Sequence, residues 1–504
     1  MTLSITTHPD YDNATVELKK TRDCVLGSPF VKNEGYIYLP HPSQIDPNSQ
    51  EQQVRYKEFK AGAEFPDDTA KTKRTLLGKM RFDDADIELP DSLEYLRDNV
   101  DGDGTYSTTA MESSVGEALE TKFHLLVTDY KGLSDVDLQS VSLADIEALD
   151  PRATVKQYPR ESITNWNFSR IDGAMQLTYL QLLEIGYDFD LDTGTRDKVE
   201  SYLILALDED GNYYQQKKIV SGKSEVSEGE RSYVTVNGSP LRWLPVQFVA
   251  DEALNPGCLP RGYGFLHPIA DACLSKYNVS AVYKEVQRNL APTTYTSGWK
   301  AGDFEIFQEA NGGRSYVATG AGAVNNMPEG VTSQILSVAM SMDDFHWYFN
   351  DADKKIQRLG GSQSSDVQMT ATEADIVATD QNALLNSIAT SCENAWKMSF
   401  LYCGMFEGLW SQDDLEGNSD DITVNLPRDF ATPRLTVEEV RVLLEMRQAR
   451  TISEAELQRQ LSNGGWLVED AMKILEELDN ESPSMDLPVI GETPQNLTNN
   501  TNQQ

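Results

Sequence analysis

The residue types that perform most enzyme chemistry are few and scattered in this 504-residue chain. The five histidines lie far apart in the sequence: His8, His41, His124, His267 and His346. None belongs to an H-E-x-x-H pair, and neither a G-x-S-x-G nor a G-x-x-x-x-G-K-[ST] motif occurs. Because no nucleophile stands at a known spacing from a base, the sequence predicts no catalytic residues, no cofactor and no enzyme activity.

The cysteines give no framework either. There are five, an odd number, at widely spaced positions: Cys24, Cys258, Cys273, Cys392 and Cys403. Since no C-x-x-C pair occurs, we expect neither disulfides nor a thiolate zinc site.

Two acidic loops resemble cation sites. Asp101 and Asp103, with Glu112 at the twelfth position, imitate a calcium loop, but Tyr106 stands where the tight turn needs glycine. A second cluster consists of Asp188, Asp190 and Asp192. We expect a helix entry at the first loop and a solvated hairpin turn at the second. Calcium binding at these five aspartates is the alternative.

The net charge excludes one class of protein. With 80 Asp and Glu against 43 Lys and Arg, the formal net charge is -37. A protein that binds nucleic acid through its phosphates needs a basic surface, because the release of counterions supplies most of the affinity. The chain is therefore not an ordinary DNA-binding protein. Self-repulsion that keeps the protein soluble is one explanation of the charge, and a surface that lies close to DNA without adhering to it is the other.

A few basic residues stand out against this background. They gather near the ends of two predicted helices: Lys284 and Arg288 in the first, and Lys354, Lys355 and Arg358 in the second. Placement in a last helical turn is explained by the helix dipole. The alternative is a ring of positive charge that faces a phosphate backbone.

The length predicts about three or four structural units, and the 39% of hydrophobic residues suffices for several cores. No apolar run is long enough for a membrane span, and the first twelve residues are too polar for a secretory signal. We therefore expect a protein that stays in water inside the cell that makes it.

Periodicity and capping signals predict the elements of the first half. Helices are expected over residues 12–26, 50–59, 70–79, 91–98 and 107–121, an extended arm over 36–42, and a strand over 123–127. Alternation and turn signals such as Asn237-Gly238 then predict one antiparallel sheet between about 158 and 250.

The second half alternates long helices with short units. Helices are predicted over 267–291, 341–359 and 371–409, the last about 60 Å long, followed by a strand over 422–426. Between the first two, Phe304 to Phe307 and Ser315 to Val317 read as a hairpin around Asn311-Gly312-Gly313. Ser362, Gln363, Ser364, Ser365 and Asp366 form a polar loop before the long helix. Residues 433–480 read as helical, and 481–504 as a disordered tail.

Motifs along more than 450 residues resemble one family. They are Arg22-Asp23, Gly27, Val31-Lys32, Gly35, Tyr38-Leu39-Pro40, Thr75-Leu76, Gly78, Asp101-Gly102, Asn165-Trp166, Asp172-Gly173, Leu244-Pro245 and Thr370-Ala371-Thr372-Glu373-Ala374. In this order, with the succession of helices, the chain resembles the portal (head-to-tail connector) proteins of tailed bacteriophages, in a subgroup catalogued only as a domain of unknown function.

The resemblance implies an α+β subunit with named regions. The wing comprises 1–266, with its sheet at about 158–250, and returns as the long helix and strand of 370–432. The stem helices are 267–291 and 341–359, the clip is 292–340, the channel loop is 360–369, and the helical crown is 433–480, followed by an acidic tail over 481–504.

The resemblance also implies a function and partners. About twelve copies would form a ring at one capsid vertex, through which double-stranded DNA is packaged, retained and ejected without sequence specificity. The loop from Ser362 to Asp366 would line the channel. The partners would be the terminase large subunit, major capsid and scaffolding proteins and a head-tail adaptor, in a virion assembled in the host cytoplasm, with no membrane.

Two alternatives stay open at this stage. The chain could be another oligomeric virion scaffold, from a tail or baseplate, with no DNA passage. It could also be a carboxylate-dependent hydrolase, which predicts a monomer or dimer with a closed cleft.

Overall fold

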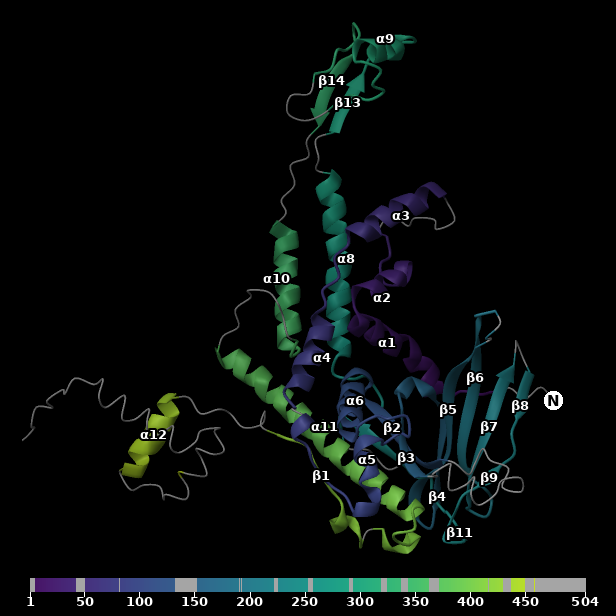
Figure 1. Cartoon of the computed structure of the whole chain (residues 1–504). Coiled ribbons are helices and arrows are strands. Elements are labelled where there is room, and N and C mark those ends of the chain that lie inside the picture. The colour runs from purple at the N-terminus through teal and green to yellow at the C-terminus, as the bar shows by residue number, and fades with distance from the viewer. Residues whose placement is uncertain are drawn as a thin grey trace, which may run out of the picture. The chain divides into compact units, whose positions relative to one another are not determined.

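The computed structural model (Figure 1) describes residues 5–41, 50–80, 82–131, 152–189, 191, 193–221, 225–252, 257–289, 293–318, 324–336, 343–361, 371–415, 417–428, 437–448 and 457. The chain divides into two compact units, Met1–Arg428 and Asp429–Gln504. Helices and antiparallel sheets both contribute, which confirms the α+β class at this coarse level.

Helices α1 (Pro9–Leu26), α4 (Asp68–Gly78), α6 (Ser107–Thr121) and α8 (His267–Asn289) pack against one another. Pro9 opens α1, and the side chain of His8 caps it by accepting the backbone N–H of Asp10. Further helices in this half are α2 (Ser28–Asn33), α3 (Gln50–Gly62) and α5 (Tyr95–Asp98). The extended arm predicted over 36–42 is wrong at its start, because Gly35–Ile37 forms a 3-10 turn.

The main core lies between a small sheet and a long helix. The sheet has the order β12-β2-β3, from β2 (Phe123–Lys131), β3 (Arg152–Tyr158) and β12 (Val246–Ala250), and α6 and α11 (Ala371–Phe406) pack against it. α11 has 36 residues, and its predicted range ends three residues later at 409. Trp396 and Phe400 of α11 are fully buried. Burial of such large aromatic side chains contributes strongly to the stability of a core.

The position of β12 corrects one prediction. The sequence pattern places it in the large sheet, but it pairs antiparallel with β2, where Phe248 faces Leu125. The alternation of apolar residues predicts a strand but not the strand with which it pairs. α11 packs against both β12 and β2, and burial of their apolar residues under this helix favours that pairing.

The larger sheet has the order β4-β5-β6-β7-β8, with β9 (Ser232–Tyr233) beside β7. Its strands are β4 (Ile163–Ile171), β5 (Ala174–Phe189), β6 (Arg196–Leu207), β7 (Tyr213–Ser221) and β8 (Glu225–Glu228). Asp172 and Gly173 both have positive φ, as a two-residue hairpin turn requires. Two further pairs are β10 (Thr235–Val236) with β11 (Ser239–Pro240), and β1 (Asp86–Glu88) with β15 (Thr423–Asn425), which lies inside the predicted strand 422–426.

A separate hairpin connects α8 to α10 (Asp343–Arg358). Its strands are β13 (Thr293–Ser297) and β14 (Thr332–Leu336), and α9 (Asp303–Ala310) lies between them in the chain. The predicted hairpin around Asn311 is therefore wrong, because 304–307 is helical. Phe307 is buried with its ring 5.7 Å from that of Trp299, while Phe304 and Ile306 are exposed. This one-sided burial favours the helix.

In the second unit the structure describes α12 (Val437–Gln448) and a helical Leu457. The remaining predictions for 433–480, and the tail of 481–504, lie outside the described residues.

Candidate functional site

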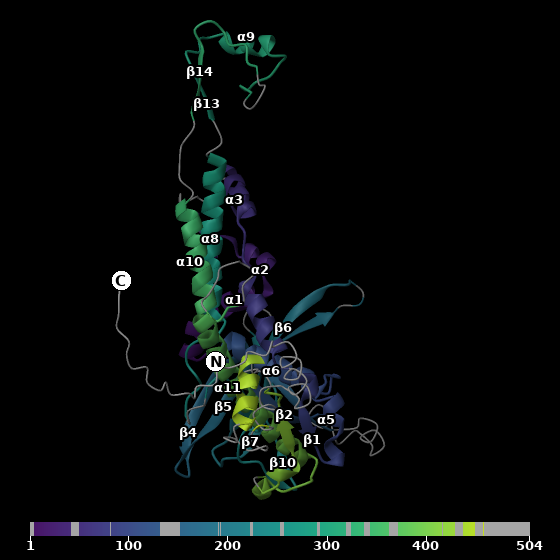
Figure 2. The same ribbon diagram turned by 90° about the vertical axis from the view of Figure 1, so that its left-hand side faces the viewer.

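Helices α8 and α10 run side by side in opposite directions, as Figure 2 shows. Tyr283, late in α8, contacts Phe345 and Phe349, early in α10, with ring centroids 5.4 and 5.8 Å apart. Lys276, earlier in α8, reaches Asp353, later in α10. The pair is antiparallel because the two contacts run in opposite order along the two helices.

Helix α10 has two different faces. The side toward α8 carries Ala352 and Ile356, both buried, in register with Phe345 and Phe349 at helical spacing. The opposite side exposes Trp347, which is 68% exposed, and the basic side chains that follow it at helical spacing. A helix that is packed on one side only presents its other side to solvent or to a partner.

The five predicted basic residues therefore separate into groups. Lys354, Lys355 and Arg358 are exposed on α10, and Arg358 has one distant ion pair, 4.0 Å to Glu373. On α8, Lys284 pairs with a carboxylate of its own chain, 3.1 Å from Glu64. The side chain of Arg288 lies outside the described residues.

An ion pair that the sequence did not suggest joins the two helices. Lys276 donates to Asp353 at 2.5 Å, and Asp353 is only 7% exposed. Asp68 of α4 lies near them: burial raises its pKa, Lys276 opposes the shift and Asp353 adds to it. No local signal marks this pair, since 77 residues separate its members.

The entry to the predicted polar loop is held by three elements. Gln381 of α11 donates to the carbonyl of Gly360 at 2.5 Å and accepts from Lys79, after α4, at 2.7 Å. Gly360 has a φ of +82°, and a Cβ there would lie 2.8 Å from Phe265. Both features favour glycine at this position. Ser362, Gln363, Ser364, Ser365 and Asp366 themselves lie outside the described residues.

The Asp101 loop uses its own carboxylate. Asp101 accepts the backbone N–H groups of Asp103 and Thr105, at 2.8 and 3.2 Å, and the Thr105 hydroxyl at 2.6 Å. Burial raises the pKa of Asp101, but these hydrogen bonds outweigh burial and hold the pKa below its ordinary value. The loop leads into α6 and borders an open cleft of about 520 Å³. The helix entry is thus confirmed, and calcium at Asp101 and Asp103 stays a prediction.

Asp188 lies near the end of β5, directly opposite Asp197 of β6. The pairing of β5 with β6 confirms a hairpin here, but Asp188 belongs to the strand and not to the turn. Asp190 and Asp192 lie outside the described residues, so calcium binding there stays untested.

No helix in the described part of the chain is both long and apolar enough to cross a membrane.

No protein-family model and no curated protein matches the chain. Solved structures of gene transfer agent (GTA) particles are similar to it. The neck of an empty GTA particle computed with C6 symmetry has 14% identity and a TM-score of 0.39, covering 80% of this chain and 96% of that one. The neck of a native GTA particle computed with C12 symmetry has 12% identity and a TM-score of 0.40, covering 78% and 89%. The virion of a native GTA particle has 13% identity and a TM-score of 0.37, covering 86% and 99%. Similarities at this level do not assign the chain to a family.

Proposed function

We propose that the chain is the subunit of a phage portal, a ring that forms the DNA channel at one capsid vertex for genome packaging, retention and ejection. The antiparallel pair of α8 and α10 carries the proposal. The β13–β14 hairpin joins the ends of the pair, and the long α11 follows α10 after the polar loop. This is the order of stem, clip, stem, channel loop and wing helix that the resemblance to portal proteins implies.

The distribution of charge fits passage of DNA without tight binding. A chain with a net charge of -37 repels phosphate overall. Lys354, Lys355 and Arg358 on the exposed side of α10 provide a small basic area. Each phosphate that a protein neutralises must be released again before the duplex advances, so few such contacts favour sliding.

The proposal includes the partners that a portal needs. About twelve copies close one ring, double-stranded DNA passes through it, and the terminase large subunit, a head-tail adaptor, and major capsid and scaffolding proteins dock on it. The subunit resides in the virion after assembly in the host cytoplasm. It acts without a cofactor and performs no catalysis of its own.

The test is the state of the purified full chain. Light scattering should give a mass of about twelve subunits, and particle images should show an axial opening wide enough for B-DNA. A closed assembly without an axial opening would identify a different virion scaffold. A monomer or dimer under all assembly conditions would overturn the ring itself.

A second measurement addresses the channel. Assembled rings should bind duplex DNA only weakly. Replacing Asp366 by Asn should change genome retention more than ring formation, because the loop lies on the path of the duplex in this proposal. Nanomolar, strongly salt-dependent affinity for duplex DNA would contradict passive passage.

A further inference from the structure

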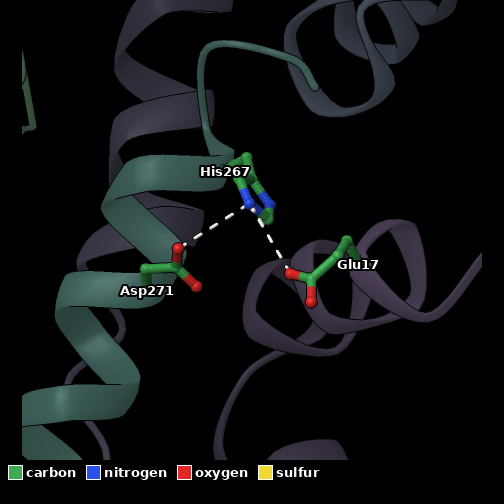
Figure 3. A group of neighbouring side chains, drawn as sticks. All are labelled: Glu17, His267 and Asp271. Carbon is green, nitrogen blue, oxygen red and sulfur yellow. Dashed lines mark ion pairs between the residues drawn. The ribbon is translucent and has the colours of Figure 1, made fainter. Parts of the chain in front are cut away.

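Three side chains with metal-binding atoms converge where α1 meets α8 (Figure 3). Glu17 comes from α1, and His267 and Asp271 come from the first turns of α8. The Nε2 atom of His267 lies 3.7 Å from Glu17 Oε2 and 3.7 Å from Asp271 Oδ2. Among the described residues, this is the one group of three such side chains whose ligand atoms all lie within 4.8 Å of one another.

Thr21 contacts the other nitrogen of the imidazole. Its hydroxyl lies 3.2 Å from the carbonyl of Glu17 and 3.0 Å from Nδ1 of His267, and donation to the carbonyl leaves its oxygen to accept from Nδ1. Nδ1 then holds the hydrogen, and the lone pair of Nε2 points toward the two carboxylates. Histidines that bind a metal through one ring nitrogen are usually held in place by a hydrogen bond from the other ring nitrogen.

One cation already borders the group. Lys20 pairs with Glu17 Oε2, the oxygen that faces His267, and lies 2.7 Å from Asp271 Oδ1, which does not face His267. Its single charge does not balance two carboxylates. The ring of Tyr263 stacks on His267 with centroids 4.3 Å apart.

We propose that Glu17, His267 and Asp271 bind one divalent transition-metal ion of the zinc class, with Thr21 as an outer partner and Lys20 as a cation that competes for the two carboxylates. One imidazole and two carboxylates suit zinc, and they leave a fourth position for water. With bonds of about 2.0–2.1 Å, ligand atoms of a tetrahedral site lie about 3.4 Å apart. The 3.7 Å separations seen here therefore need to close by only a few tenths of an ångström. The ion would join α1 to α8.

The proposal goes beyond the portal function and does not depend on it. The test uses the full chain, freed of metal by a chelator, and titrates Zn²⁺ by calorimetry, with Mg²⁺ for comparison. We expect one Zn²⁺ per chain and much weaker binding of Mg²⁺. Glu17→Gln and His267→Ala should each weaken Zn²⁺ binding by more than about tenfold. His346→Ala, at an exposed histidine on α10, is the matched control and should change nothing.

Lys20→Met separates a metal site from a network of ion pairs. Removing the competing ammonium should tighten Zn²⁺ binding, whereas a purely structural role of Lys20 would only lower the melting temperature. Co²⁺ gives a second readout, because its visible absorption should appear in the native chain and in His346→Ala but not in His267→Ala. If His267→Ala does not fold, Glu17→Gln at the partly exposed carboxylate provides the same comparison. Absence of Zn²⁺ binding, or binding that neither site variant weakens, would overturn the proposal.

Discussion

Trp396 donates its indole N–H to the hydroxyl of Ser114 over 3.0 Å, and so joins α11 to α6 across 282 residues of sequence. Ser114 donates in turn to the carbonyl of Ala110. Its oxygen also lies within hydrogen-bonding distance of Nε2 of His124, at 3.1 Å. All three polar side chains are buried. One hydroxyl therefore bonds the indole N–H of Trp396 and one ring nitrogen of His124 in the main core.

Ser114→Ala should destabilise the protein by about 2–3 kcal/mol, because it leaves the buried N–H groups of Trp396 and His124 without a partner. Chemical denaturation followed by tryptophan fluorescence measures this loss. Ser113→Ala removes an equal hydroxyl from the exposed side of the same helix and should cost almost nothing. A similar small effect at both positions would contradict the role given to Ser114.

The second prediction concerns acid stability. Burial lowers the pKa of His124 to about 3, with the charge of Arg22 as a smaller cause, while the unfolded chain keeps an ordinary value near 6.5. Below about pH 6.5 the unfolded state binds this proton and the folded state does not. The free energy of unfolding therefore decreases as the pH is lowered from about 6.5 to about 3. The contribution is about 1.4 kcal/mol per pH unit.

Denaturation midpoints between pH 7 and pH 4 should show this loss. His124→Gln should reduce the slope by about one proton in that range. Equal slopes in the native protein and in the variant would show that His124 does not titrate as a buried neutral group.

Arg22 gives the third prediction. Its guanidinium binds three carboxylates, those of Glu117, Glu120 at 2.7 Å and Glu161 at 2.7 Å, and so joins α1 to α6. Its side chain is 23% exposed and that of Glu120 only 3%. Arg22→Met should cost about 3 kcal/mol, because it removes the guanidinium that three carboxylates share and leaves buried Glu120 with Lys73 as its remaining partner.

Arg261→Met is the control for charge removal. Arg261 is 83% exposed and has one ion pair, 3.3 Å to Asp10. Such exposed pairs contribute at most about 1 kcal/mol. Thermal melts of both variants should therefore separate clearly, and comparable melting temperatures would count against the Arg22 network.

The fourth prediction tests the basic side of α10. The triple variant Lys354→Gln, Lys355→Gln and Arg358→Gln should still form rings, because these side chains are exposed. The affinity of rings for duplex DNA should fall. Its dependence on salt should weaken by about 0.9 in logarithmic slope for each phosphate that the ring no longer neutralises.

A matched variant removes three charges elsewhere: Lys57→Gln, Lys60→Gln and Arg74→Gln on α3 and α4. Its salt dependence should equal that of the native ring. If both triple variants bind alike, net charge alone governs the interaction, and α10 does not face the duplex.

Local sequence signals are sufficient to predict a helix whose capping residues and apolar spacing lie within the helix itself. The range predicted for α6 matches the structure, and those for α8, α10 and α11 agree within a few residues, because caps, prolines and apolar spacing act over one or two turns. The β13–β14 pairing and α9 were missed. Strand partners 35 or more residues apart leave no local mark, and a short helix such as α9 is decided by burial of Phe307 against Trp299.

The candidate sites divide in the same way. Composition and helical spacing in the sequence already placed Lys354, Lys355 and Arg358 at the end of one helix within a strongly acidic chain. Only the tertiary structure showed that Lys284 is paired with Glu64, that β12 joins β2, and that Glu17 meets His267. The sequence determines the period and the ends of a helix or strand, because residues close in the chain interact directly. Contacts between distant residues depend on which faces become buried against each other, and only folding of the whole chain decides which faces do.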